Sequence, residues 1–231
     1  FWSGDNKSWN AGDLKFADLD ESGVVDNGSN RLDDHGDLRI IGNQSPRYRY
    51  GVNLSARWNG IGLSVFLQGV GARDWYPGSD AGMFWGKYGR PFFALIPSIH
   101  NYTDDMYSAE RNNWDTAYWP RMTTYQSNGT KNWTRLLEIP NTRYIQSAAY
   151  LRVKNIQLDY SFPKHICSAI RLQGLKIYVN AENLFTFTPL HKYAPNFDPE
   201  GLSYDSDFAS AADGYTYPIL KSVTVGVNIT F

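Results

Sequence analysis

The clearest arrangement of possible metal ligands is the segment DLDESGVVD at residues 18–26, which has the spacing of a calcium-binding loop. Side-chain oxygens stand at positions one, three, five and nine, glycine at six and a backbone carbonyl at seven: Asp18, Asp20, Ser22, Asp26, Gly23 and Val24. Calcium takes about six to eight oxygen ligands, and glycine lets the chain turn sharply around the ion. Position twelve is Ser29 instead of an acidic residue, so the spacing leaves the closing ligand open. A solvated turn rich in Asp and Ser is the alternative interpretation.

Aromatic side chains are concentrated in the stretch 72–146: Trp75, Tyr76, Phe84, Trp85, Tyr88, Phe92, Phe93, Tyr102, Tyr107, Trp114, Tyr118, Trp119 and Trp133. Exposed aromatic rings offer a large contact area to sugar rings or peptide side chains at a small entropy cost. We predict Trp114, Tyr118 and Trp119 as substrate-binding residues. Alternatively, most of these rings pack a small core within the loop or lie against a partner protein.

Four acidic residues in the same stretch could supply the paired carboxylates of a glycosidase: Asp104, Asp105, Glu110 and Asp115. Such a pair needs a separation of about 5–9 Å, which the sequence does not define. The chain has no G-x-S-x-G elbow, phosphate-binding loop or zinc pattern. Its single cysteine, Cys167, and four scattered histidines fit no metal-site spacing. The sequence therefore predicts a protein that is not an enzyme and has no catalytic residues.

Composition argues against two further classes of protein. The formal net charge of -1 provides no basic face for nucleic acid. The 231 residues have a mean hydropathy of -0.47 and contain no run of about eighteen apolar residues, which a membrane-spanning helix requires. The chain starts at Phe1 without a signal peptide, so we expect it to be a piece of a longer protein.

Five segments alternate apolar and polar residues, which predicts β-strands over residues 48–58, 61–69, 150–162, 175–187 and 222–231. In the third segment, Leu151 and Val153 are out of phase with Ile156. A β-bulge near Asn155 would bring all three onto one face. The fifth segment, SVTVGVNITF, ends on Phe231.

The connections between these segments differ greatly in length. Asn59–Gly60 is a tight turn and 163–174 is compact, whereas long polar, aromatic-rich stretches run up to residue 46 and over 72–146 and 189–220. Short turns at one end and long loops at the other are typical of outer-membrane barrels, although a soluble β-sandwich also has alternating strands. We therefore predict an all-β, transmembrane antiparallel β-barrel. Because the smallest bacterial barrels have about eight strands, we expect further strands before Phe1.

Polar strand residues are expected to face a water-filled lumen: Arg49, Asn53, Arg57, Gln68, Lys176, Asn180 and Glu182. A Lys or Arg facing lipid at the membrane midplane would cost about 2–4 kcal/mol. Aromatic residues near the strand ends fit an interfacial girdle: Tyr48, Trp58, Tyr160, Phe162 and Phe231.

Several blocks resemble the C-terminal part of the SusC/RagA-type TonB-dependent transporters of the Bacteroidetes outer membrane. They include GDLKFADLDESGVVD, PRYRYGVNLSARWNGIGLSVFLQGVGARDWYP, YLRVKNIQLDYSFPK, YVNAENLFTFT and YPILKSVTVGVNITF. The resemblance implies a 22-stranded barrel with an N-terminal plug. It also implies a SusD-like surface lipoprotein as partner and TonB-driven import of oligosaccharides or peptides. Neither a plug nor a TonB-contacting segment is present among the 231 residues.

The resemblance makes residues 1–231 the C-terminal portion of such a barrel, with extracellular loops at 18–37, 72–146 and 189–220. In the family a Gly-Asp pair closes the calcium loop, which implies Asp37 as the last ligand, with Asp33 and Asp34 as rivals. The calcium would be structural. A terminal strand that ends in Phe231 resembles the signal read by the barrel-assembly machinery. The alternative function is a soluble or surface carbohydrate-binding β-sandwich module.

Overall fold

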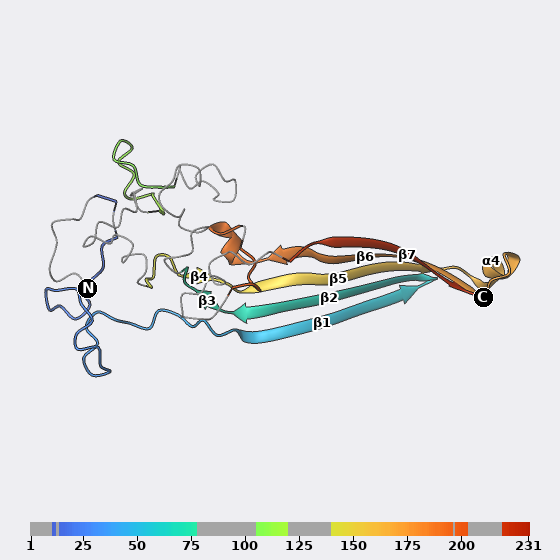
Figure 1. Cartoon of the computed structure of the whole chain (residues 1–231), viewed down its shortest axis with the longest axis horizontal. Helices are drawn as coiled ribbons and strands as arrows, with labels where there is room; N and C mark the ends of the chain where they lie inside the picture. Colours follow the sequence, from blue (N-terminus) through green and yellow to red (C-terminus); the bar gives the residue numbers. More distant parts are fainter. Residues whose placement is uncertain (1–10, 13, 78–104, 120–139, 196, 203–218) are drawn as a thin grey trace, which may run out of the picture.

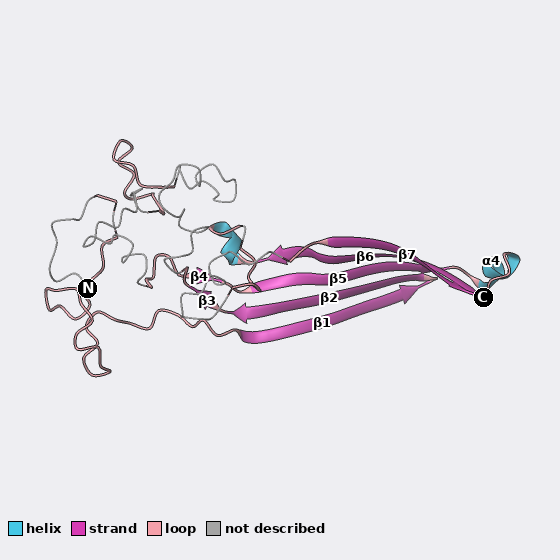
Figure 2. Ribbon diagram, in the orientation of Figure 1, coloured by secondary structure: helices cyan, strands magenta, loops and turns pink. Residues whose placement is uncertain are grey.

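The computed structural model describes residues 11–12, 14–77, 105–119, 140–195, 197–202 and 219–231. Five long strands form one antiparallel sheet in the order β1-β2-β5-β6-β7 (Figures 1 and 2). They are β1 (Arg47–Trp58), β2 (Ile61–Ala72), β5 (Tyr150–Ser161), β6 (Gly174–Phe187) and β7 (Ser222–Thr230). All five predicted strands are confirmed, and the described part of the chain is mostly antiparallel sheet.

The strand register places apolar and polar residues on opposite faces of the sheet. One row across all five strands is apolar: Leu54, Val65, Ile156, Ala181 and Val223. The neighbouring row is polar: Ser55, Ser64, Gln157, Asn180 and Thr224. Many apolar side chains are far from buried, with Leu54 55% and Val225 72% exposed. No second layer therefore covers this face within the described residues.

A β-bulge at Lys154 accounts for the change of phase in β5. Phe66 of β2 pairs with Asn155 and Leu67 pairs with Val153, so Lys154 is an extra residue between them. Leu151 and Val153 consequently lie on the same face as Ile156. The predicted bulge near Asn155 is confirmed.

The short connections lie at one end of the sheet. Asn59 and Gly60 have φ of 49° and 88°, the two left-handed conformations of a type I′ hairpin turn. The amide of Ser161 in β5 donates to the Gly60 carbonyl at 2.8 Å, which ties this turn to the strand that neighbours β2 in the sheet. The connection between β5 and β6 contains the short helix α4 (Lys164–Ala169), which begins after Pro163 and buries Cys167.

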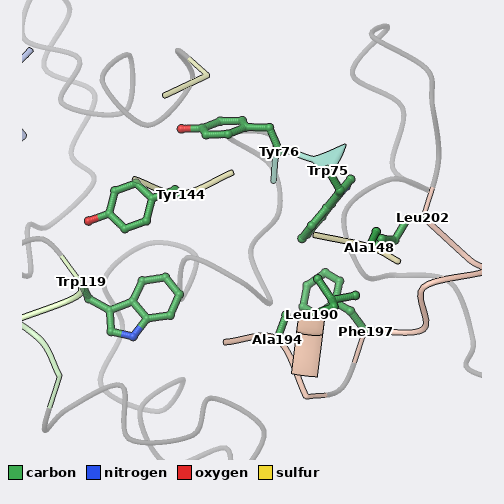
Figure 3. Close-up of a cluster of buried hydrophobic side chains, with 9 residues drawn as sticks. All are labelled: Trp75, Tyr76, Trp119, Tyr144, Ala148, Leu190, Ala194, Phe197 and Leu202. Atoms are coloured by element: carbon green, nitrogen blue, oxygen red, sulfur yellow. The ribbon is translucent and has the colours of Figure 1, made fainter. Parts of the chain in front are cut away.

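The described parts of the long connections lie at the opposite end of the sheet (Figure 1). They contain three short elements that the alternation did not predict: β3 (Asp74–Trp75), β4 (Gln146–Ser147) and the 3-10 helix η3 (Pro189–Lys192). Around these elements lies a core of buried side chains: Trp75, Tyr76, Trp119, Tyr144, Ala148, Leu190, Ala194, Phe197 and Leu202 (Figure 3). No helix in the described ranges is long and apolar enough to cross a membrane.

Candidate functional site

Three carboxylates meet at the predicted calcium loop: two from the segment 18–26 that the spacing identified, and that of Asp37, which the resemblance implied. Oxygen atoms of Asp18, Asp20 and Asp37 all lie within 4.8 Å of one another. Oδ1 of Asp37 accepts a hydrogen bond from the amide of Leu19, and Oδ2 accepts one from the amide of Asp26 at 2.8 Å. The bonds from Leu19 and Asp26 lower the pKa of Asp37 and outweigh its partial desolvation. The residues therefore present the oxygen-rich, negatively charged ligand set that suits Ca²⁺.

The turn around this group has the predicted glycine at its centre. Gly23 has φ of +83°, which few other residues adopt. Its amide donates to Oδ2 of Asp18 at 2.7 Å, and the amide of Ser22 donates to Oδ1 of Asp20 at 3.0 Å. The backbone thus orients the carboxylates of Asp18 and Asp20 towards the inside of the turn.

The other predicted ligands make different contacts. The hydroxyl of Ser22 donates to the carbonyl of Val24 at 3.0 Å, and Oδ1 of Asp26 accepts from the amide of Gly28 at 2.7 Å. These contacts engage two side-chain oxygens and one carbonyl, all three within the loop itself. The carboxylate group identified among the described residues does not include Asp26.

The structure also distinguishes the three acidic residues considered for the closing position. Asp34 accepts a hydrogen bond from the amide of Ser29 at 3.0 Å, and hydrogen bonds from Ser29 lower the pKa of its carboxylate. Asp34 therefore stabilises the turn that contains Ser29. Of Asp33, Asp34 and Asp37, only Asp37 belongs to the carboxylate group within the described residues.

The three predicted substrate-binding aromatics lie in different environments. Trp119 is 2% exposed and belongs to the buried core (Figure 3), whereas Trp114 is 72% exposed. Tyr118 is partly buried, and its ring stacks on Tyr193 with centroids 3.7 Å apart. Several other aromatics of this stretch, together with Asp104, lie outside the described residues: Phe84, Trp85, Tyr88, Phe92, Phe93, Tyr102 and Trp133.

Arg143 is held beside these aromatics and was not predicted from the sequence. Its Nε donates to the carbonyl of Tyr118 at 3.1 Å and its Nη2 donates to the carbonyl of Ala117. In return, the hydroxyl of Tyr118 donates to the carbonyl of Arg143 at 3.2 Å. Burial raises the pKa of Tyr118 to about 12, so this hydroxyl stays protonated at neutral pH.

A cavity of about 490 Å³ lies between this region and the N-terminal segment. Trp119 and Tyr144 of the buried core line it together with the exposed Trp114. Lys15 and Arg143 also line it, and the described lining residues include no carboxylate. Two of the predicted aromatics are thus brought to one cavity, whereas Tyr118 supports it through Arg143.

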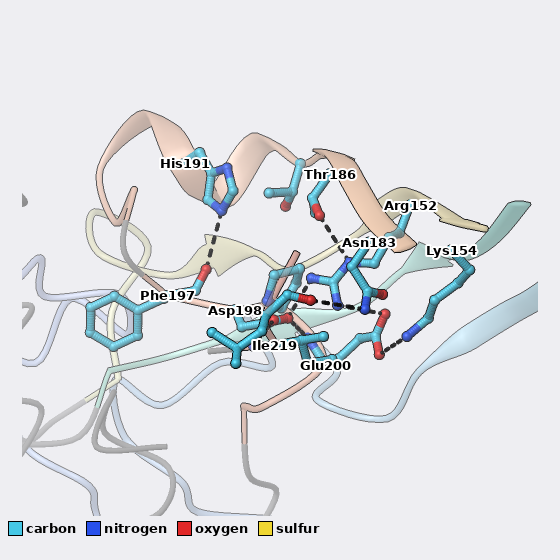
Figure 4. A network of polar contacts seen from close by, with 12 residues as sticks. Arg152, Lys154, Asn183, Thr186, His191, Phe197, Asp198, Glu200 and Ile219 are labelled. Atoms are coloured by element: carbon cyan, nitrogen blue, oxygen red, sulfur yellow. Dashed lines mark hydrogen bonds and ion pairs between the residues drawn. The ribbon is translucent and has the colours of Figure 1, made fainter. Parts of the chain in front are cut away.

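Ion pairs hold the described part of the 189–220 loop on the polar face of the sheet (Figure 4). Nη2 of Arg152 lies 2.7 Å from Oδ1 of Asp198, and Nη1 lies 3.0 Å from Glu200. Glu200 also pairs with Lys154, the bulge residue, at 2.8 Å. Arg73 donates to the carbonyls of Pro199 and Leu202, at 2.9 and 2.6 Å. These contacts fix residues 197–202 over the polar face.

A second ion-pair group lies on the polar face near the end with the short turns. Asp159 of β5 is 3.2 Å from Arg57 of β1 and 3.3 Å from Lys176 of β6. Asp159 is 4% exposed. A buried carboxylate needs compensating charge, and the two cations on β1 and β6 supply it. Arg57 and Lys176 were both predicted on the polar face, and the register places them there.

The curated relatives found by comparison with known proteins are all named TonB-dependent receptors. The chain is 26% identical to "TonB-dependent receptor P3" of Formosa agariphila over 222 residues, which are 94% of this chain and 19% of that protein. It is 24% identical to "TonB-dependent receptor P39" of the same organism over 227 residues, which are 98% of this chain and 19% of that protein. The chain thus spans about a fifth of the length of these curated relatives. No protein-family model matches it.

Solved structures share the fold. The RagAB peptide importer in its 'closed-closed' state superposes with a TM-score of 0.55 at 19% identity, covering 87% of this chain and 19% of that one. The 'open-open' state gives a TM-score of 0.52 over the same shares. The chain is therefore similar to TonB-dependent receptors along nearly its whole length. The resemblance to the SusC/RagA-type TonB-dependent transporters is confirmed.

Proposed function

We propose that this chain forms part of an outer-membrane importer driven by TonB, and that its five strands belong to a closed, plugged barrel of 22 strands. The observation that carries the proposal is the continuous apolar face, which has exposed apolar side chains on each of the five strands. In a lipid bilayer, such a face is solvated by hydrocarbon, while backbone groups at the free edges of β1 and β7 must pair with further strands. The polar face then lines the lumen.

The arrangement of the connections sets the proposed orientation. The described parts of 18–37, 72–146 and 189–220 lie at the end of the sheet opposite α4, and we place these connections outside the cell. The Asn59–Gly60 turn and α4 then face the periplasm. This orientation exposes the cavity at Trp114 to the medium, where a nutrient would first meet the protein.

The transported ligand belongs to the oligosaccharides or peptides, and capture at the surface involves a SusD-like lipoprotein. The relatives named TonB-dependent receptors and the fold shared with the RagAB peptide importer support this proposal. Trp114 supplies an exposed ring for ligand contact, and Trp119 forms part of the cavity wall. Tyr118 acts on the same site by holding Arg143.

Calcium is proposed as a structural ion of the 18–37 loop. Asp18, Asp20 and Asp37 would supply carboxylate oxygens, with Ser22, Val24 and Asp26 as the remaining ligands of the sequence pattern. The fit rests on the three grouped carboxylates and on the left-handed turn at Gly23. The ion would neutralise three like charges and hold the loop, and it would take no part in chemistry.

The experiment that tests the main proposal uses the full-length protein. A transmembrane barrel stays in the membrane fraction after alkaline washing and needs detergent for solubility, and deletion of its gene abolishes growth on the imported nutrient. The competing function, a soluble carbohydrate-binding β-sandwich, predicts a protein that dissolves without detergent. Recovery in the aqueous fraction would rule out the importer.

A further inference from the structure

We propose that the cavity beside Trp114 is a subsite for acidic oligosaccharides, in which Lys15 and Arg143 hold a carboxylate or sulfate group while a sugar ring lies on the indole of Trp114. This inference rests on the proposed import function, because it names the ligand class of that site. The volume of about 490 Å³ lies within the usual range for small-ligand sites.

The charged residues of the cavity wall determine which ligands it attracts. Lys15 and Arg143 are its two charged residues among the described lining residues, and both are cations. Neither makes an ion pair within the described part of the chain. Two cations on one cavity, with no carboxylate among its described lining residues, favour a ligand that brings its own negative charge.

Arg143 is preorganised for such a ligand. Its Nε and Nη2 are fixed by the carbonyls of Tyr118 and Ala117, and its Cζ lies 5.9 Å from the centroid of the Tyr118 ring. Nη1 has no acceptor among the described residues. A guanidinium held in this way binds an anionic group with little further loss of side-chain entropy.

The aromatic residues of the cavity favour a sugar over a peptide side chain. Trp114 is 72% exposed and stacks on no other described ring, although it lines the cavity. Trp119 and Tyr144, which pack with 6.1 Å between their centroids, form a rigid wall beside it. The flat C–H face of a pyranose ring suits the open indole, and the exposed Thr142 at the same cavity offers a hydroxyl to the sugar hydroxyls.

The test is calorimetric titration of the full-length protein in detergent, which needs no TonB and no transport. The acidic probes are oligogalacturonate, oligomannuronate and chondroitin sulfate oligosaccharides. A neutral cello-oligosaccharide of equal length and an oligoglutamate peptide of equal charge are the comparisons. We expect at least one acidic oligosaccharide to bind more tightly than both comparisons, and its affinity to fall as the salt concentration rises.

Two variants report on the cavity with little disturbance of the loop, because Lys15 and Trp114 are exposed and their side chains make no hydrogen bond, ion pair or ring contact with the described residues. Lys15→Gln and Trp114→Ala should each weaken binding of the acidic oligosaccharide by about tenfold. Lys164→Gln removes the same charge from α4, at the other end of the sheet, and should leave binding unchanged. Arg143→Lys keeps the charge but loses the fixed fork, and should also weaken binding.

Three results would overturn the inference: equal binding of the neutral oligosaccharide, preference for the acidic peptide, or no binding of any acidic oligosaccharide. Unchanged affinity of Lys15→Gln and Trp114→Ala would do the same. These outcomes leave the importer proposal intact, because that proposal depends on membrane insertion and nutrient uptake. Conversely, a soluble protein that still binds acidic sugars through Lys15 and Trp114 would overturn the importer proposal alone.

Discussion

The guanidinium of Arg152 lies 2.7 Å from the carboxylate of Asp198, although the two residues are 46 positions apart and belong to a strand and a loop. Their side chains are only 4% and 9% exposed. Burial by itself would raise the pKa of Asp198, but hydrogen bonds from Arg152 and from the amide of Glu200 lower it. The same carboxylate accepts a hydrogen bond from the amide of Ile219 at 3.2 Å. Asp198 therefore connects the sheet to residues near both ends of the 189–220 loop that the structure describes.

Substitution Asp198→Ala should release this loop from the polar face. Asp198→Ala removes one of the two carboxylates that pair with the buried Arg152 and leaves Glu200 in place. The cost should therefore stay below the roughly 3 kcal/mol of a fully broken buried ion pair. We expect faster hydrogen exchange in residues 197–202 and at Ile219, measured by mass spectrometry on the full-length protein. Glu200→Gln should have a smaller effect, because Glu200 is more exposed and Arg152 keeps Asp198. Equal exchange in Asp198→Ala and the parent protein would show that the pair does not hold the loop.

Val225→Arg and Thr224→Arg place the same cation on opposite faces of β7. Val225 pairs with Val179 on the apolar face, and Thr224 pairs with Asn180 on the polar face. Only Val225→Arg should impair membrane insertion, because a cation facing lipid near the midplane costs about 2–4 kcal/mol. Heat modifiability on gels and the yield in the outer-membrane fraction measure the difference. Similar yields for both variants would contradict a lipid-facing apolar row.

Gly226 lies under the ring of Tyr178 on the neighbouring strand. A Cβ atom added at Gly226 would come within 2.3 Å of Cζ of Tyr178, so Gly226→Ala must displace the ring. We expect the free energy of unfolding to fall by about 1–3 kcal/mol. The measurement is denaturant unfolding of the detergent-solubilised protein. Tyr178→Ala should reduce this loss in the double variant. Gly174→Ala is the matched control, since its Cβ would meet Thr230 at 3.6 Å, an ordinary contact.

The sequence predicted the sheet well because its signal is local. Alternation places Val225 and Thr224 on opposite faces whatever the rest of the chain does, and the phase change before Ile156 was enough to predict the bulge. Two-residue strands such as β3 carry no such period, because their length is set by the loop that they close. The sequence pattern therefore did not predict these two-residue strands.

In the candidate sites, too, local spacing was predictable from the sequence, whereas contacts set by the tertiary fold were not. The grouping of Asp18 with Asp20 follows from the loop spacing, whereas Asp37, the predicted closing ligand, came from the resemblance and not from the spacing. Arg143 and Lys15 meet at one cavity only through the tertiary fold, and no motif connects them. Likewise, an isolated Trp gives no indication in the sequence of whether it is buried, as Trp119 is, or exposed, as Trp114 is.

Asp37→Ala should abolish the effect of calcium on the 18–37 loop, because it removes one of three grouped carboxylates and the acceptor of the Leu19 and Asp26 amides. The measurement is limited proteolysis with and without a chelator, with cleavage in this loop mapped by mass spectrometry. The parent protein should be protected only in calcium. Asp33→Ala should behave like the parent, because Asp33 lies outside the group. Chelator-independent digestion of the parent would argue against the ion.

The lowered pKa of Asp37 predicts how the metal-free loop responds to acid. Since hydrogen bonds from the amides of Leu19 and Asp26 hold this pKa below its ordinary value of 3.8, the ionised form stabilises the loop. That stabilisation is fully present above about pH 4 and is lost as the pH falls through the pKa of the folded state. Hydrogen exchange at these amides, corrected for its intrinsic pH dependence, should therefore accelerate only below that range. In Asp37→Asn the protection should already be weak at neutral pH and should not change on acidification, and a parent-like acid response in this variant would assign the transition to another group.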